Sequence, residues 1–187
     1  QGNCAACHPS GTAALRGTES KLCLSCHPGL AEDLKAGRPH GPLTGDDSCT
    51  ACHSPHTAPQ APLLPASQAQ VCGRCHEAEA STANGALHRH PDRGGKGCTT
   101  CHDPHVSPPE GTLALRLQAR CVGCHDFKEH ANHPMGDKVI DQRTKQPLTC
   151  VSCHDPHGSA FEKMRRDDPG GRLCVPCHSE KVRPKRS

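Results

Sequence analysis

The spacing of the cysteines constrains this chain more than any other feature. All 16 cysteines occur in C-x-x-C pairs, and a histidine directly follows each pair. The pairs are Cys4 and Cys7, Cys23 and Cys26, Cys49 and Cys52, Cys72 and Cys75, Cys98 and Cys101, Cys121 and Cys124, Cys150 and Cys153, and Cys174 and Cys177. The histidines that follow, here called proximal and used to name the sites, are His8, His27, His53, His76, His102, His125, His154 and His178.

The C-x-x-C-H motif is typical of c-type haem attachment. Two thiols at this spacing can bond to the two vinyl groups of one porphyrin, while the adjacent imidazole binds the iron. The chain is therefore predicted to carry eight haems c, one at each site.

Other uses of paired cysteines explain the pattern less well. Cys7 and Cys23 have the separation of a four-cysteine zinc ribbon, but such a site has no use for the histidines. A disulfide framework predicts no histidines either, and a thioredoxin-type redox pair needs a strand and helix that this sequence does not predict.

The composition predicts a chain without an ordinary core. Only 33% of the residues are hydrophobic and 1% are aromatic, which is too few to offset the conformational entropy of folding. The 18 Gly and 18 Pro favour loops and turns. We expect mostly irregular coil, short helices at the C-x-x-C-H sites, little or no β-sheet, and an elongated stack of haems as the core.

The C-x-x-C-H sites recur in a repeat of about 49 residues, and each repeat contains two sites. The four repeats cover approximately residues 4–48, 49–97, 98–149 and 150–187 and are predicted to form one octahaem domain over residues 1–187. Units of this kind are stable by stacking on their neighbours.

A second histidine follows three of the sites, in CTACHSPH (49–56), CTTCHDPH (98–105) and CVSCHDPH (150–157). His105 lies in a tight turn fixed by Pro104, and it cannot pass around the porphyrin edge to the opposite face of its own haem. We therefore expect it to bind the iron of another haem and to hold two haems close together.

The number of histidines favours two imidazoles on every iron. Besides the proximal residues there are eight others, here called distal: His40, His56, His88, His90, His105, His130, His133 and His157. The four repeats contain one, three, three and one of them, so ligands must cross between repeats or between molecules. A histidine ligand supplied head to tail by another molecule would link copies of the chain into a filament. His88 and His130 are the two for which a surface role is the main alternative.

Charge gives little support to nucleic-acid binding. The formal charge is +3 before haem attachment, but two propionates and one ferric iron per haem bring it to about −5. The 22 Lys and Arg are then expected to pair with propionates. The basic segment 183–186 is interpreted as a solvated tail, with docking as the alternative.

The expected location is outside the cytoplasm, because haem is attached to thiols there. The sequence has no membrane-spanning segment, and its start at Gln1 is what a mature form without its signal peptide would show. We expect an extracellular protein, with the periplasm as the alternative.

The three C-x-x-C-H-x-P-H stretches resemble the doubled haem motif of multihaem c-type cytochromes from metal-reducing and related anaerobes. The short chain per haem and the repeats resemble extracellular cytochrome filaments, or nanowires, although periplasmic shuttle cytochromes share the motifs. In these families C-x-x-C-H supplies the thioethers and the proximal ligand, which implies the same at all eight sites here. The first copy, CAACHPSG, has Gly11 in place of the second histidine.

Three functions follow as hypotheses. The first is a polymeric wire that carries electrons to external acceptors or partner cytochromes, because irons with two histidines have no open position for a substrate. The second is a monomeric periplasmic shuttle or store. The third, an octahaem reductase, needs an open iron and acid-base groups, so we predict no enzyme activity. Met135 is interpreted as a packing residue and not as an axial ligand.

Overall fold

The C-x-x-C-H sequences form single turns in the computed structural model, which describes residues 3–45, 48–91, 97–107, 113–126, 128–130, 133–168 and 172–179. In these turns the backbone N–H of the proximal histidine donates to the carbonyl oxygen of the first cysteine, at 2.9 or 3.0 Å, at His8, His27, His53, His102, His125, His154 and His178. Residues at positions i, i+3 and i+4 share one side of such a turn. Both thiols and the imidazole therefore point the same way.

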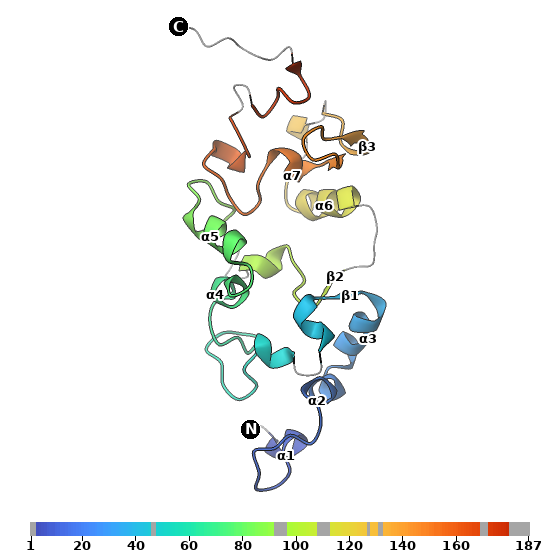
Figure 1. Cartoon of the computed structure of the whole chain (residues 1–187), viewed down its shortest axis with the longest axis vertical. Helices are drawn as coiled ribbons and strands as arrows, with labels where there is room; N and C mark the ends of the chain where they lie inside the picture. Colours follow the sequence, from blue (N-terminus) through green and yellow to red (C-terminus); the bar gives the residue numbers. More distant parts are fainter. Residues whose placement is uncertain are drawn as a thin grey trace. The chain divides into compact units, whose positions relative to one another are not determined.

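The helices are short and several coincide with the sites, as the sequence predicts (Figure 1). The α-helices are α1 (Cys4–Cys7), α2 (Glu19–Cys26), α3 (Pro28–Ala36), α4 (Gln68–Gly73), α5 (Glu77–Gly85), α6 (Leu113–Val122) and α7 (Cys150–Cys153). The 3₁₀ turns are η1 (Gly41–Thr44), η2 (Cys49–Ala51), η3 (Gly97–Thr100), η4 (Lys128–His130) and η5 (Glu162–Met164).

The described residues contain two small antiparallel sheets of two strands each. Strand β1 (Arg38–Pro39) pairs with β2 (Val106–Ser107), and β3 (Gly136–Ile140) pairs with β4 (Pro147–Leu148). The prediction of a mostly irregular chain with little β-sheet is thus confirmed.

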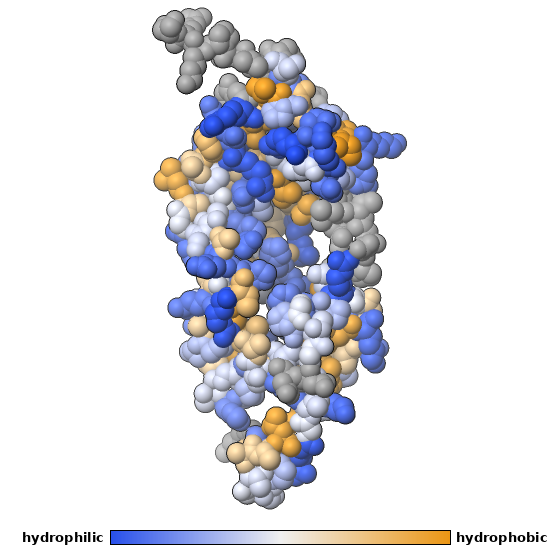
Figure 2. Space-filling view, viewed as in Figure 1, coloured by the Kyte–Doolittle hydropathy of each residue, from blue (hydrophilic) through white to orange (hydrophobic). Residues whose placement is uncertain are grey.

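Apolar side chains form almost no core of their own. Among the described residues the buried hydrophobic ones are Leu64, Val71 and Val106. On the face drawn in Figure 2, the coloured residues alternate between hydrophobic and hydrophilic over short distances. This composition is too poor in buried apolar surface to order the chain by side-chain packing alone.

The chain divides into two compact units. Unit 1 comprises Gln1–Cys75 and Arg93–Pro109, and unit 2 comprises His76–Asp92 and Glu110–Ser187. The second and third repeats each contribute to both units. No helix in the described part of the chain is long and apolar enough to cross a membrane. The basic segment 183–186 lies outside the described residues.

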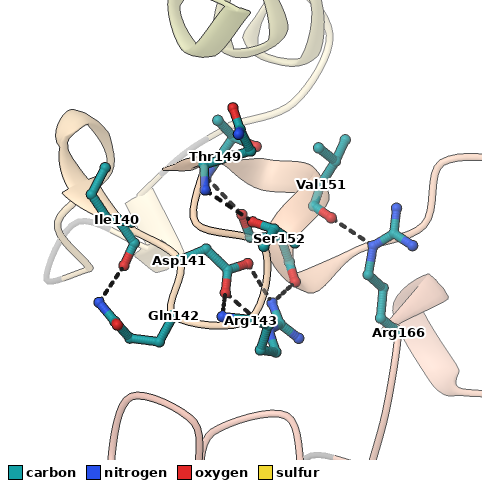
Figure 3. A network of polar contacts seen from close by, with 10 residues as sticks. Ile140, Asp141, Gln142, Arg143, Thr149, Val151, Ser152 and Arg166 are labelled. Atoms are coloured by element: carbon teal, nitrogen blue, oxygen red, sulfur yellow. Dashed lines mark hydrogen bonds and ion pairs between the residues drawn. The ribbon is translucent and has the colours of Figure 1, made fainter.

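A buried carboxylate joins the β3–β4 hairpin to α7 (Figure 3). The side chain of Asp141 is fully buried, and it accepts hydrogen bonds from Arg143 Nε at 3.1 Å and Nη2 at 2.9 Å. Arg143 also donates to the carbonyl oxygen of Ser152, inside the CVSC sequence of α7. The bonds from Arg143 hold the pKa of Asp141 below its ordinary value. The hairpin thereby fixes one C-x-x-C turn through charge-assisted bonds.

We predict that Asp141→Asn lowers the free energy of unfolding of the haem-loaded protein by about 2 kcal/mol at pH 7, because it leaves Arg143 without its buried partner. Since the pKa is depressed in the folded state, this contribution is present above the ordinary carboxyl pKa of about 3.9 and is lost as pH falls through the folded value. Denaturant unfolding followed by circular dichroism measures it. The exposed Asp137→Asn is the matched control, and equal stability of both variants at pH 7 would contradict the prediction.

Candidate functional site

The structure brings five proximal histidines against a distal one. The distances between ring centroids are 5.9 Å for His8 and His56, 5.9 Å for His53 and His105, 5.8 Å for His125 and His90, 6.0 Å for His154 and His130, and 6.2 Å for His178 and His133. Two imidazoles on opposite sides of one metal ion have ring centres about 6 Å apart, since a metal–nitrogen bond is about 2 Å and the ring centre lies roughly 1 Å beyond the nitrogen. The pairs have the spacing that an iron with two axial imidazoles requires.

Every one of these five pairs joins two different repeats. His56 and His105, the second histidines of the H-x-P-H sequences, lie beside the first proximal histidine of the preceding repeat. His90 and His133 lie beside the second proximal histidine of the following repeat. Because each pair takes its two histidines from different repeats, a repeat with few distal histidines can be paired with those of its neighbour.

The H-D-P-H turn is fixed by its aspartate. The Oδ1 atom of Asp103 accepts hydrogen bonds from the backbone N–H groups of His105 at 2.9 Å and Val106 at 3.3 Å. Asp155 accepts in the same way from the N–H of His157 at 3.1 Å. Such an Asx turn sets the backbone direction at the second histidine.

A backbone carbonyl fixes the ring of the proximal histidine at three first sites. The Nδ1 atom lies 2.8 Å from the oxygen of Ala14 in His8, 3.0 Å from that of Pro62 in His53, and 2.8 Å from that of Lys163 in His154. A carbonyl can only accept, so Nδ1 carries the proton and Nε2 keeps its lone pair. This is the arrangement in which histidine binds a metal through Nε2.

Burial keeps one distal imidazole in the form that binds metal. It lowers the pKa of His105, and the neighbouring His53 and His40 act in the same direction, while Asp103 opposes them. Burial therefore favours the neutral form of the His105 ring. Only the neutral imidazole has the nitrogen lone pair that a metal needs.

Thiols of successive sites lie next to each other in unit 1. Cys49 hydrogen-bonds to Cys23, and Cys72 to Cys98; in each case burial and this neighbour raise the thiol pKa to about 11. Cys52 also interacts electrostatically with Cys72. The second site of one repeat thus adjoins the first site of the next. In unit 2, burial raises the pKa of Cys153, whose neighbours include Cys174.

Polar contacts that the sequence analysis missed hold these adjoining sites together. The carboxylate of Glu19, at the start of α2, accepts from the backbone N–H of Thr50 and from its Oγ1 at 3.0 Å. In the next repeat, Gln68 Oε1 accepts from the backbone N–H of Thr99 at 3.1 Å, and Gln68 Nε2 donates to Thr99 Oγ1 at 3.0 Å. The signal was present, because Glu19 and Gln68 both stand four residues before a site's first cysteine and both threonines directly follow one.

The other predicted ligands are placed as follows. His27 and His76 begin α3 and α5 as their N-caps, and His102 follows η3. The N–H of His40 donates to the oxygen of His105 at 2.9 Å, and His88 exchanges two backbone hydrogen bonds with Ser159. His157 lies in its Asx turn. The role of these six residues as iron ligands stays a prediction, as does that of the ten histidines in the five pairs.

No disulfide joins any of the 16 cysteines, all of which lie among the described residues, so each sulfur can form a thioether bond. Among the described residues, which include every cysteine and histidine, no group of three or more His, Cys, Asp or Glu is arranged to hold a bare metal ion. The residues instead fit haem: two thiols and an imidazole on one side of a turn, and a second imidazole at the spacing of an opposite axial ligand.

Turns of this kind, repeated along a coil-rich chain, define a multihaem c-type cytochrome, an electron-transfer protein with covalently bound haem. Comparison with protein families supports this class. The doubled CXXCH motif family matches residues 40–81, 90–130 and 143–183, more than half of the chain, and the protein belongs to that family. The first repeat up to residue 39 lies outside the matches. No curated protein matches the chain.

We predict that His105→Ala opens the sixth position of the His53 site and leaves the His102 site of its own motif unchanged. One haem should become high-spin, which absorption and electron paramagnetic resonance (EPR) spectra detect. Removing the His53 site as well, with Cys49→Ser and Cys52→Ser, should abolish the high-spin signal, whereas Cys98→Ser and Cys101→Ser should not. If the high-spin signal instead disappeared with Cys98→Ser and Cys101→Ser and remained with Cys49→Ser and Cys52→Ser, the assignment of His105 to the His53 site would be wrong.

Proposed function

We propose that the chain binds eight haems c, each iron between two imidazoles, and passes electrons from site to site along the repeats. The observation that carries this proposal is the closeness of successive sites in unit 1: Cys49 lies beside Cys23 and Cys72 beside Cys98, and the bonds of Glu19 to Thr50 and of Gln68 to Thr99 join the same two pairs of sites. Since these thiols bond to porphyrin edges, the haems they hold would be neighbours. Electron transfer is fast between neighbouring haems and slows steeply with distance.

The proposed chemistry of the sites is electron transfer without substrate turnover. Two axial imidazoles occupy both free positions of a haem iron, so a substrate has nowhere to bind. The five histidine pairs are spaced for this arrangement. We therefore propose that the protein is a carrier and not a reductase.

We further propose that copies of the chain assemble head to tail into an extracellular filament that carries electrons to external acceptors or partner cytochromes. Exchange of histidines already joins each repeat to its neighbour within the chain. The same exchange can join the last repeat of one copy to the first repeat of the next, a contact that does not close on itself. Export follows from the chemistry of haem attachment to thiols.

One observation favours the alternative, a monomeric periplasmic shuttle. The last repeat has a single distal histidine, but both of its proximal histidines, His154 and His178, lie beside histidines of the third repeat in the same chain. That end of the chain thus needs no ligand from another molecule.

The haem count tests the first proposal. The intact mass of the denatured protein should correspond to the polypeptide plus eight haems, because thioether bonds survive denaturation. The double variant Cys4→Ser and Cys7→Ser removes a site that lies before the first family match, and it should carry seven haems. A wild-type mass with fewer than eight haems would contradict the proposed count.

Electron microscopy separates the filament from the shuttle. Negative staining of the haem-containing extracellular fraction, with the protein identified by mass, should show thin uniform filaments made of this chain. Purified protein should lengthen into filaments as its concentration rises. Particles that stay monomeric at all concentrations, recovered from the periplasm, would contradict the filament and support the shuttle.

A further inference from the structure

The five histidine pairs fall into two geometric classes. The ring planes are nearly parallel in three of them, with interplanar angles of 22° for His8 and His56, 16° for His53 and His105, and 15° for His133 and His178. They are close to perpendicular in the other two, at 80° for His90 and His125 and 66° for His130 and His154.

The His154 site shows that the distal residue sets this angle. Its proximal ring is bonded through Nδ1 to a backbone carbonyl at 2.8 Å, as the rings of His8 and His53 are. The distal histidines of those two sites come from H-x-P-H turns and give parallel rings. His130 comes instead from the 3₁₀ turn η4 and gives a steep angle. The same proximal arrangement with a different distal residue thus yields a different site.

His90 owes its orientation to a different local cause. Its Nδ1 atom lies 3.3 Å from the carbonyl oxygen of Pro91, the next residue in the chain. This contact turns the ring toward its own backbone. This contact therefore orients the ring at the His125 site, whereas a following proline alone does not, because His133 also precedes a proline and its pair is nearly parallel.

The angle between two axial imidazoles affects the energy of ferric iron. Two iron d orbitals can interact with the π electrons of the axial rings, and each ring raises the energy of the one that overlaps with its π orbitals. Parallel rings raise the same d orbital, so the two d orbitals differ in energy, and this difference stabilises low-spin ferric iron, which lacks one electron in them. Perpendicular rings raise one d orbital each, so the two d orbitals stay equal in energy. Ferrous iron, with these orbitals filled, gains nothing from the splitting. Perpendicular rings therefore favour the reduced state.

We propose that His90 and His130 are positioning residues that create two haem sites of a distinct electronic class, at His125 and His154, with higher reduction potentials than the same sites would have with parallel rings. The inference rests on the proposed ligation of each iron by two imidazoles. Electrons travelling along the repeats would be held preferentially at these two sites, both of which belong to unit 2.

EPR spectroscopy of the oxidised protein tests this inference. Parallel rings give a rhombic low-spin signal and perpendicular rings a highly anisotropic one with a large maximum g value, so the wild type should show both. His130→Ala should remove part of the anisotropic signal and leave the rhombic one. The matched control His105→Ala should remove part of the rhombic signal and leave the anisotropic one.

Free imidazole separates orientation from the mere loss of a ligand. Added to His130→Ala, it should restore low-spin iron with a changed g maximum and a lower potential at that haem in a redox titration, because the added ring is no longer held by η4. Full low-spin ligation with only rhombic signals in the wild type would overturn this inference and leave the proposed function intact. High-spin iron at most sites would overturn the proposed function itself.

Discussion

The single helical turn that places two thiols and one imidazole on the same side is the constraint on which the rest of this molecule depends. Three hydrophobic side chains are buried among the described residues, too few to order a chain of 187 residues. We propose that covalently bound haem supplies the missing apolar surface. The turn needs only one backbone hydrogen bond, from the histidine N–H to the first cysteine, so it can form locally before any long-range contact.

Order over longer distances comes from contacts between repeats. Each of the five histidine ring pairs described above joins two repeats, and bonds such as those of Glu19 to Thr50 hold adjoining turns together. In most repeat proteins apolar interfaces perform this task. Here polar contacts and, under the proposed ligation, haems shared between repeats would take their place, so the surface can remain hydrophilic and the chain rich in glycine and proline.

The sequence predicts local features, such as the turns at the sites, and does not predict which residues from different repeats contact each other. Short turns at the sites, coil elsewhere and the alternation of sites follow from residue types and spacing, and the structure agrees with the first two. The partner of each distal histidine could not be predicted, because motif spacing contains no information on which repeats meet; only the exclusion of His105 from its own haem came from chain length. The buried Asp141 and Arg143 were missed because they lie in a hairpin that has no counterpart in the described residues of the other repeats.

The division between a fixed proximal side and a variable distal side has a physical consequence. At His8, His53 and His154 the proximal ring is held by its own turn and by a carbonyl a few residues later, so its position and its tautomer are set within one repeat. The distal ring comes from a different repeat, through an Asx turn, a His-Pro sequence or a 3₁₀ turn. Under the proposed ligation, a substitution of the distal residue would change the second imidazole and leave the haem-attaching cysteines untouched. Eight C-x-x-C-H motifs could then hold haems of different electronic character, because the distal residue lies outside this motif.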